Sequence, residues 1–206
     1  GTTLTRVAGG GRTLMPGLID NHVHVLLSTT SQAELLDPKM TPAMLQERAT
    51  AEAERTLLRG FTAVRDMGGP MLASRFSIDK GELPGPRIYP SGAMVSQTSG
   101  HGDSRHPHER SRRFFGEVSR GEQLGANFIA DGRDEVLTAT RENLRAGATQ
   151  IKVMAGGGAA SAYDPLDVTQ YTLDEMKAAV EAAADWGTYV TVHAYTPRAV
   201  RRALDA

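Results

Sequence analysis

The chain has 206 residues, of which 40% are hydrophobic and 23% are charged, and its formal net charge is −1. This composition is typical of a globular protein and excludes a collagen-like, coiled-coil or mainly disordered chain. The near-neutral charge argues against a nucleic-acid-binding protein, because phosphate contacts need an excess of basic residues. No apolar run approaches the roughly 20 residues of a membrane-spanning helix. We therefore expect neither nucleic acid nor a membrane as a partner.

The sequence has no Cys, which excludes disulfides and thiolate chemistry. Any metal site must therefore use His, Asp, Glu or a modified Lys. Residues 1–6 do not form a signal peptide, and they do not resemble a native start either. A cytoplasmic location is the default expectation, without positive support.

The first half of the chain alternates short apolar runs with amphipathic stretches. The predicted order is a strand at 18–25, a helix at 43–59, a strand at 61–66, a helix at 71–79 and a strand at 86–91. Thr41 and Pro42 are typical of a helix start, and Gly60 is typical of a helix end. Residues 96–131 interrupt the alternation, because they are polar and rich in Arg, and we expect an irregular lid there.

Regular alternation returns after this segment. The predicted order is a helix at 134–146, a strand at 149–154, a helix at 173–186, a strand at 189–193 and a helix at 197–204. Thr172 and Glu175 have the spacing of a capping box at the start of the middle helix. Five strands separated by helices indicate parallel βα units in an α/β fold. Such units close either as a (β/α)₈ barrel or as an open doubly wound sheet.

Chemically versatile side chains end the predicted strands. His22 and His24 end the first strand, Asp66 the second, Lys152 the fourth and His193 the fifth. In parallel α/β folds, sites are built at the carboxyl ends of the strands. Because residues two apart on a strand point to one face, His22 and His24 can share a metal ion. A pair of hydrogen-bonded histidines is the alternative interpretation.

Residues 13–24, which read Thr-Leu-Met-Pro-Gly-Leu-Ile-Asp-Asn-His-Val-His, resemble the signature P-G-x-I-D-x-H-x-H of the metal-dependent amidohydrolase superfamily. The resemblance continues in residues 60–66, 85–88, 99–103, 150–157 and 192–195. It is greatest to the branch of imidazolonepropionase-like proteins, prolidases and other Xaa-dipeptidases, and ochratoxin-type amidases. This resemblance implies a (β/α)₈ TIM-type barrel, with about its first five βα units in residues 16–206. Residues 1–15 would be the remnant of a small β-sandwich.

The resemblance also implies a binuclear site for two divalent ions, with zinc as the expected metal. His22 and His24 match the ligands of the more buried ion, and His193 matches a ligand of the second. Lys152 matches the lysine that is N-carboxylated by CO₂ and bridges both ions. A buried lysine loses its proton more readily, and the neutral amine can then take up CO₂. A lysine that reaches solvent or pairs with a carboxylate is the alternative.

Three further residues are candidates for contact with the substrate. In this branch the histidine that matches His101 faces the substrate and binds its scissile carbonyl or carboxylate, whereas a loop histidine held by backbone contacts is the alternative. Tyr163 and Tyr195 can donate to the substrate, with simple packing as the alternative. Asp66 is expected to be a structural hydrogen-bond partner rather than a ligand.

The Arg-rich lid supplies a possible recognition surface for an anionic group. Guanidinium groups suit carboxylates, although a solvated charge run is the favoured explanation for most of them. The arginines concerned are Arg105, Arg110, Arg112 and Arg113. We expect His106 and His108, in the same segment, to be solvated.

The expected activity is hydrolysis of a small-molecule amide or dipeptide by a metal-bound hydroxide. A dipeptide or N-acyl amino acid with a free carboxylate is the favoured substrate. A cyclic-amide hydrolase of the imidazolonepropionase type is one alternative, and a non-catalytic metal-binding fragment or assembly module is another. The oligomeric state is open, and a homo-oligomer is compatible with the sequence.

The family's complete site needs two residues that this sequence does not contain. They are a histidine after the sixth strand and an Asp after the eighth, whereas the sequence ends 13 residues after His193. We therefore expect the chain to be part of a longer enzyme and not to be active alone.

Overall fold

The structure is a computed structural model that describes residues 3–161 and 163–206. Its strands form two parallel sheets. The first sheet has the order β1 (Leu18–Val23), β2 (Phe61–Asp66), β3 (Arg87–Pro90). The second has the order β5 (Asn127–Ile129), β4 (Met94–Ser96), β6 (Ile151–Met154), β7 (Val190–His193). Every described pair of neighbouring strands is parallel, as the alternation of strands and helices predicted.

The two sheets are joined into one wall. β3 and β4 follow each other along a single bent stretch of chain, and the N–H of Thr149 donates to the carbonyl of Pro90 at 2.8 Å. The start of β6 therefore lies beside the end of β3. Across the combined wall the strands follow the order β1, β2, β3–β4, β6, β7, which is also their order in the chain. A doubly wound sheet reverses its strand order, whereas the strands of a barrel keep it. The arrangement matches the first part of a (β/α)₈ barrel and confirms the expected fold class.

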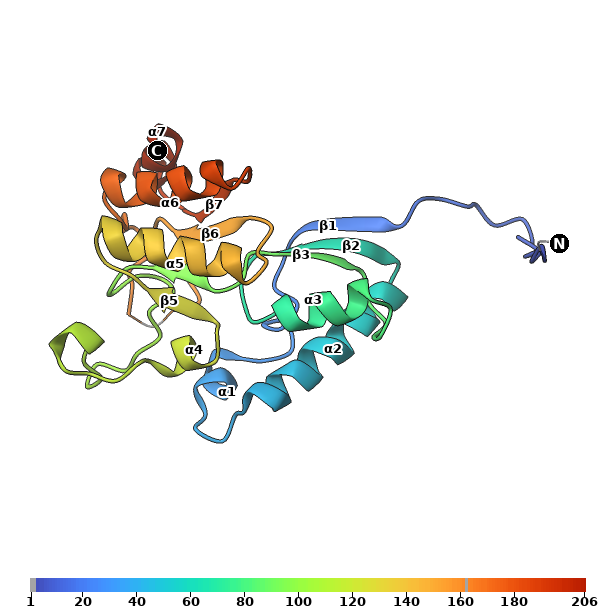
Figure 1. The fold of residues 1–206 in the computed structure, drawn as a ribbon, viewed down its shortest axis with the longest axis horizontal. Coiled ribbons are helices and arrows are strands. Elements are labelled where there is room, and N and C mark those ends of the chain that lie inside the picture. The colour runs from blue at the N-terminus through green and yellow to red at the C-terminus, as the bar shows by residue number, and fades with distance from the viewer. Residues whose placement is uncertain (1–2, 162) are drawn as a thin grey trace.

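Helices cover the outside of this wall (Figure 1). They are α1 (Gln32–Leu36), α2 (Pro42–Leu58), α3 (Leu72–Asp79), α4 (Arg120–Gln123), α5 (Arg133–Arg145), α6 (Leu173–Asp185) and α7 (Pro197–Asp205). α2 packs on β2 and α3 on β3, while α5 and α6 pack together against β6. No helix within residues 3–161 and 163–206 is long and apolar enough to cross a membrane.

Two hydrophobic clusters lie between these layers. One is built from α2, β2, β3 and neighbouring loops and includes Leu45, Val64 and Ile88. The other lies between α5, α6 and β6 and includes Ile151 and Met176. Each cluster packs one group of strands against its helices. The strand residues that are candidates for the site belong to neither cluster.

The segment expected to be an irregular lid, residues 96–131, contains more regular structure than we predicted. It holds a 3₁₀ turn (Arg112–Phe114), the short helix α4 and the strand β5. β5 pairs with β4 and adds a strand beside the wall. A strand of three residues is too short to show a periodic pattern in the sequence, which explains why it was missed.

The N-terminal segment has no regular structure. Residues 3–17 form neither helix nor strand, and they extend away from the rest of the molecule (Figure 1). No strand in the described chain pairs with them. The expectation that residues 1–15 belong to a β-sandwich therefore stays a prediction, and residues 1 and 2 lie outside the described part.

Candidate functional site

One pocket collects five of the predicted site residues. It has a volume of about 340 Å³ and lies at the carboxyl ends of β1 and β7, beside β6. Predicted residues that line it are His22, His24, His101, Lys152 and His193. They come from three strands and one loop that are far apart in the sequence, so the fold brings them together as expected.

Hydrogen bonds to β2 hold the segment that carries the first two histidines. The N–H of Met67 donates to the carbonyl of Val23 at 2.8 Å. The N–H of Val25 donates to Oδ1 of Asp66, also at 2.8 Å. Asp66 is fully buried and acts as a structural partner, as predicted. The chain on both sides of His24 is therefore fixed, and the rings of His22 and His24 lie with their centroids 5.6 Å apart.

Backbone carbonyls set the orientation of two imidazoles. Nδ1 of His24 lies 3.4 Å from the carbonyl oxygen of Gly68, and Nε2 of His193 lies 3.0 Å from that of Gly157. A carbonyl only accepts, so each of these nitrogens carries the proton of its neutral ring. The lone pairs are left on Nε2 of His24 and on Nδ1 of His193. Metal-binding histidines are commonly oriented by this kind of second contact.

The local environment favours uncharged side chains in the pocket. Burial lowers the pKa of His24 to about 4. The pKa values of His22 and His193 are also lowered, in each case chiefly by burial and further by Lys152. Neutral imidazole is the form that binds metals, so all three rings have the required protonation state.

Lys152 is the most deeply buried charged residue of the site, with 2% of its surface exposed. Burial, and to a smaller extent the nearby Arg65, lowers its pKa to about 8. No carboxylate within residues 3–161 and 163–206 forms an ion pair with it. A buried ammonium without an acidic partner is unfavourable, whereas a neutral amine is easily accommodated. The alternative of a lysine paired with a carboxylate or reaching solvent finds no support in the described chain.

These observations show that the donor set fits divalent metal ions. The described residues contain no group of three or more His, Asp or Glu side chains close enough to hold an ion by themselves. A site at this position therefore depends on Lys152 in addition to the histidines. As an ammonium it has no lone pair, so it contributes only as an amine or its carboxylated form.

His101 lines the same pocket as the β1 histidines and stacks on His193. The two ring centroids are 4.0 Å apart and the ring planes differ by 11°. Nδ1 of His101 lies 2.8 Å from Oγ of Ser161 and 3.1 Å from Oδ2 of Asp164. Side chains rather than backbone groups therefore hold this ring.

The two candidate tyrosines do not line the pocket. Tyr163 is 53% exposed, and Tyr195 is 59% exposed and contacts the edge of the His193 ring at a centroid separation of 5.0 Å. Tyr195 thus lies next to the site and Tyr163 lies outside it. Their contact with a substrate stays a prediction.

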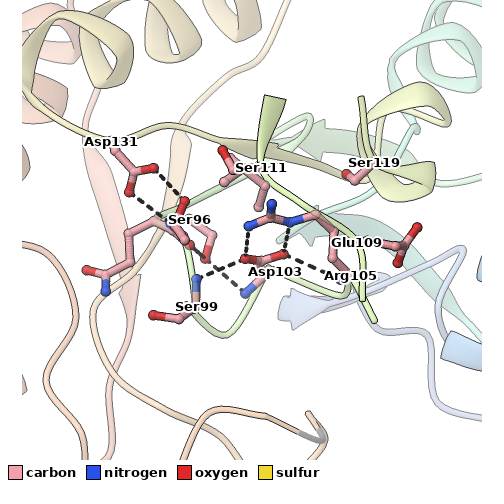
Figure 2. Close-up of polar contacts among 12 residues, drawn as sticks. Ser96, Ser99, Asp103, Arg105, Glu109, Ser111, Ser119 and Asp131 are labelled. Carbon is pink, nitrogen blue, oxygen red and sulfur yellow. Dashed lines mark hydrogen bonds and ion pairs between the residues drawn. The ribbon is translucent and has the colours of Figure 1, made fainter. Parts of the chain in front are cut away.

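The lid arginines lie outside the pocket and are largely engaged within the chain. Figure 2 shows Arg105 facing the carboxylate of Asp103, with Nη2 of the arginine 2.6 Å from Oδ2. Arg113 pairs with Glu135 at 2.7 Å, and Arg112 lies 3.8 Å from Glu122. These contacts use the guanidinium groups that we considered for an anionic substrate. Arg110 is exposed, as are His106 and His108, whose rings stack at 5.6 Å.

Sequence reasoning missed several residues in and around the pocket. Asn127 lines it, and the loop after β6 places Ser161 in it. Asp164 and Gln170 are buried directly behind His101. Asp164 matches no motif in the sequence. Only the burial of polar residues, which the sequence does not reveal, distinguishes it.

Comparison with known proteins adds independent information. The model of the Amidohydrolase family matches residues 13–206. Ochratoxinase from Aspergillus niger is 35% identical over 198 residues, which cover 94% of this chain and 41% of the relative. A solved amidohydrolase aligns with a TM-score of 0.86 and 39% identity, over 99% of this chain and 49% of its own. A prolidase complexed with N-methylphosphonate-L-proline aligns with a TM-score of 0.83 and 41% identity, over 92% and 45% of the two chains.

These matches share one property. The chain spans less than half the length of each of these relatives. The matched part is the one that holds His22, His24, Lys152 and His193.

Proposed function

This chain belongs to the amidohydrolase family, and from that premise we propose that the protein hydrolyses an amide or peptide bond at the pocket between β1, β6 and β7. One observation carries the proposal. His22, His24, Lys152 and His193 converge on a single pocket, in surroundings that favour their uncharged forms.

Two divalent ions, with zinc as the expected metal, would be held by His22, His24, His193 and Lys152 in its carboxylated form. When bound, such ions supply a water of lowered pKa and polarise the scissile carbonyl. Nε2 of His24 and Nδ1 of His193 are the donor atoms, because the other nitrogen of each ring faces a backbone carbonyl. His22 completes the pair on β1.

The proposed modification of Lys152 follows from its burial. The neutral amine attacks CO₂, a C–N bond forms, and one proton leaves to solvent, which gives a carbamate. Its two oxygens would serve as metal ligands, which an ammonium cannot do. Arg65, which lowers the pKa of Lys152, favours both the neutral amine and the anion.

The substrate class is a dipeptide or an N-acyl amino acid. A volume of about 340 Å³ suits a small molecule. Two of the similar proteins, a prolidase and an ochratoxinase, point to the same class by their names. The lid arginines give little further support for a free carboxylate, because most of them are already paired. His101 is the side chain placed to meet the scissile carbonyl.

The test combines metal analysis with an assay. We expect the longer enzyme to which this chain would belong to contain two divalent ions per chain and to hydrolyse members of a panel of Xaa-Pro dipeptides and N-acyl amino acids. Lys152→Ala should lose metal and lower kcat/KM by more than about 100-fold, because a ligand matters more than its supporting contacts. Lys177→Ala, an exposed lysine on α6, is the matched control and should change neither quantity.

Two results would contradict the proposal. Unchanged metal content in Lys152→Ala would remove this lysine from the site. A metal-loaded form of the longer enzyme that cleaves no amide of the panel would rule out the hydrolase activity.

A further inference from the structure

The loop after β6 contains a buried carboxylate that the metal site does not use. The side chain of Asp164 is 2% exposed. Its Oδ2 accepts from the N–H of Gly158 at 3.0 Å, from His101 Nδ1 at 3.1 Å and from Gln170 Nε2 at 3.4 Å. Within the described chain no Lys or Arg pairs with it. Burying a carboxylate without such a partner is costly, so this arrangement needs an explanation.

Gln170 links the carboxylate back to the same histidine. Its Oε1 accepts from the backbone N–H of His101 at 2.8 Å, while its Nε2 donates to Asp164. His101, Gln170 and Asp164 therefore form a closed ring of hydrogen bonds. This ring fixes both the backbone and the side chain of His101.

The backbone of the loop is shaped around the imidazole. A Cβ on Gly158 would lie 1.9 Å from Cε1 of His101, so only glycine permits this close approach. The same residue donates its N–H to Asp164. Stacking on His193 also holds the imidazole of His101. Its orientation is thus set by contacts from three parts of the chain.

The contacts also determine which nitrogen of His101 carries a proton. An ionised carboxylate can only accept, so Nδ1 must donate to Asp164 and to the hydroxyl oxygen of Ser161. Nε2 has no hydrogen-bond partner in the described residues, and His101 lines the pocket. Nε2 is therefore the atom available to a bound molecule.

We propose that Asp164 is the positioning residue of His101. It fixes the proton on Nδ1 and leaves Nε2 for the substrate, so that His101 meets the scissile carbonyl in one defined orientation. A buried carboxylate that orients a histidine from behind serves the same purpose in other hydrolases. The role at the substrate rests on the proposed function, whereas the orientation of the ring does not.

The first test measures the tautomer directly. Two-bond ¹H–¹⁵N correlation spectra of the ¹⁵N-histidine-labelled protein distinguish the two neutral forms, and a His101→Gln variant assigns the signal. We expect the Nδ1–H form in the unmodified protein, and a mixture of both forms in Asp164→Ala. Asp164→Asn should keep the Nδ1–H form, because its amide oxygen can accept from the same donors.

Glu52→Ala is the matched control. Glu52 is also a buried carboxylate, but it pairs with Arg55 and Arg59 on α2 and in the following turn. Its loss should destabilise the protein and leave the His101 signal unchanged. An Nε2–H form in the unmodified protein would overturn the proposal, and this measurement needs no variant to fold. An unchanged His101 signal in folded Asp164→Ala would overturn it as well.

The second test uses hydrolysis. Asp164→Ala should lower kcat about 10- to 100-fold, the usual effect of a supporting contact, and Asp164→Asn should restore part of it. KM and bound metal should change by less than about twofold in both. A kcat unaffected by Asp164→Ala would overturn the role at the substrate. These rates are measured on the longer enzyme; if its unmodified, metal-loaded form cleaves no amide, the proposed function fails, and the tautomer measurement alone decides the role of Asp164.

Discussion

Asp66 illustrates how a single residue supports the site from behind. Its Oδ1 accepts the N–H of Val25, immediately after His24, whereas its Oδ2 has no partner in the described chain. Burial raises the pKa of this carboxyl to about 7, although the hydrogen bond from the backbone of Val25 opposes the shift. The anchor of the His22–His24 segment is thus a carboxyl that prefers to be protonated in the folded state.

This preference predicts a pH dependence of stability. In the unfolded chain Asp66 ionises near its ordinary value of 3.8, while in the folded chain it keeps its proton to about pH 7. Between these values the folded state binds more protons, so the free energy of unfolding falls as the pH rises. Asp66→Asn keeps an acceptor for Val25 and removes the ionisation. We expect the variant to gain stability over the unmodified protein from pH 4 to pH 7, by up to about 4 kcal/mol.

Urea denaturation at several pH values measures this difference. Asp185→Asn, an exposed carboxylate at the end of α6, removes the same charge without burial and serves as the control. Its difference from the unmodified protein should vary little with pH. A stability difference for Asp66→Asn that stays flat, or that shrinks as the pH rises, would contradict the assignment.

Among the elements, the helix starts follow local rules most closely. Three helices begin with a capping box, at Ser31–Glu34, Ser119–Glu122 and Thr172–Glu175. In the last of these, Glu175 accepts from Thr172 N–H at 2.8 Å and also from Gly132 N–H at 2.7 Å. Its carboxylate therefore joins the start of α6 to the residue that precedes α5.

Thr172→Ala should destabilise the protein by about 1 kcal/mol, because it removes the side chain that caps α6. Thr138→Ala is the control, since Thr138 lies inside α5 and its hydroxyl donates only to the carbonyl of Asp134. Alanine is the better helix former there, so this change should be neutral or slightly stabilising. Equal urea midpoints for the two variants would show that the capping box contributes nothing.

The sequence predicted elements well where a pattern extends over many residues. The long helices α2, α5 and α6 and the strands β2, β6 and β7 lie where periodicity and caps placed them. The short elements α1, α4 and β5 were missed. Ser31–Glu34 and Ser119–Glu122 carry the same signature as Thr172–Glu175, but the helices that follow are too short to show a periodic apolar face.

The same contrast applies to the site. Residues at strand ends were found because parallel strands bring their carboxyl ends together, and five of them line one pocket. Asp164 and Gln170 were missed, because their importance comes from burial behind His101 and from contacts across more than 60 positions of sequence. Local patterns do not encode such contacts.

At the scale of the whole molecule, the bend between β3 and β4 connects the two sheets. Gly92 in this bend has a φ of 72°. The side chain of Asn143 on α5 makes the hydrogen bonds to Ala93 that a neighbouring strand would otherwise make. Asn143 Oδ1 accepts from the N–H of Ala93 at 2.9 Å, and Nδ2 donates to the carbonyl of Ala93 at 2.8 Å. One buried amide thus satisfies both backbone groups at the point where the wall turns.

Each hydrophobic cluster lies on one side of this bend. The bend therefore connects two groups of strands that carry different residues of the site. Asn143→Ala leaves the N–H and the carbonyl of Ala93 buried and unpaired, and each such group costs about 1 to 3 kcal/mol. We expect the variant to lose roughly 2 to 4 kcal/mol of unfolding free energy. Hydrogen exchange should show the largest loss of protection at the amide of Ala93.

Thr140→Val is the control for Asn143→Ala, because it removes an unpaired buried polar group from the same helix. The hydroxyl of Thr140 is buried and has no partner in the described chain. Replacing it with a methyl group of similar shape removes an unsatisfied polar group, so the change should be neutral or stabilising. If Asn143→Ala and Thr140→Val lose similar amounts of unfolding free energy, then α5 is sensitive to any core substitution. If only Asn143→Ala is destabilised, its pair of hydrogen bonds is what holds the two sheets in one wall.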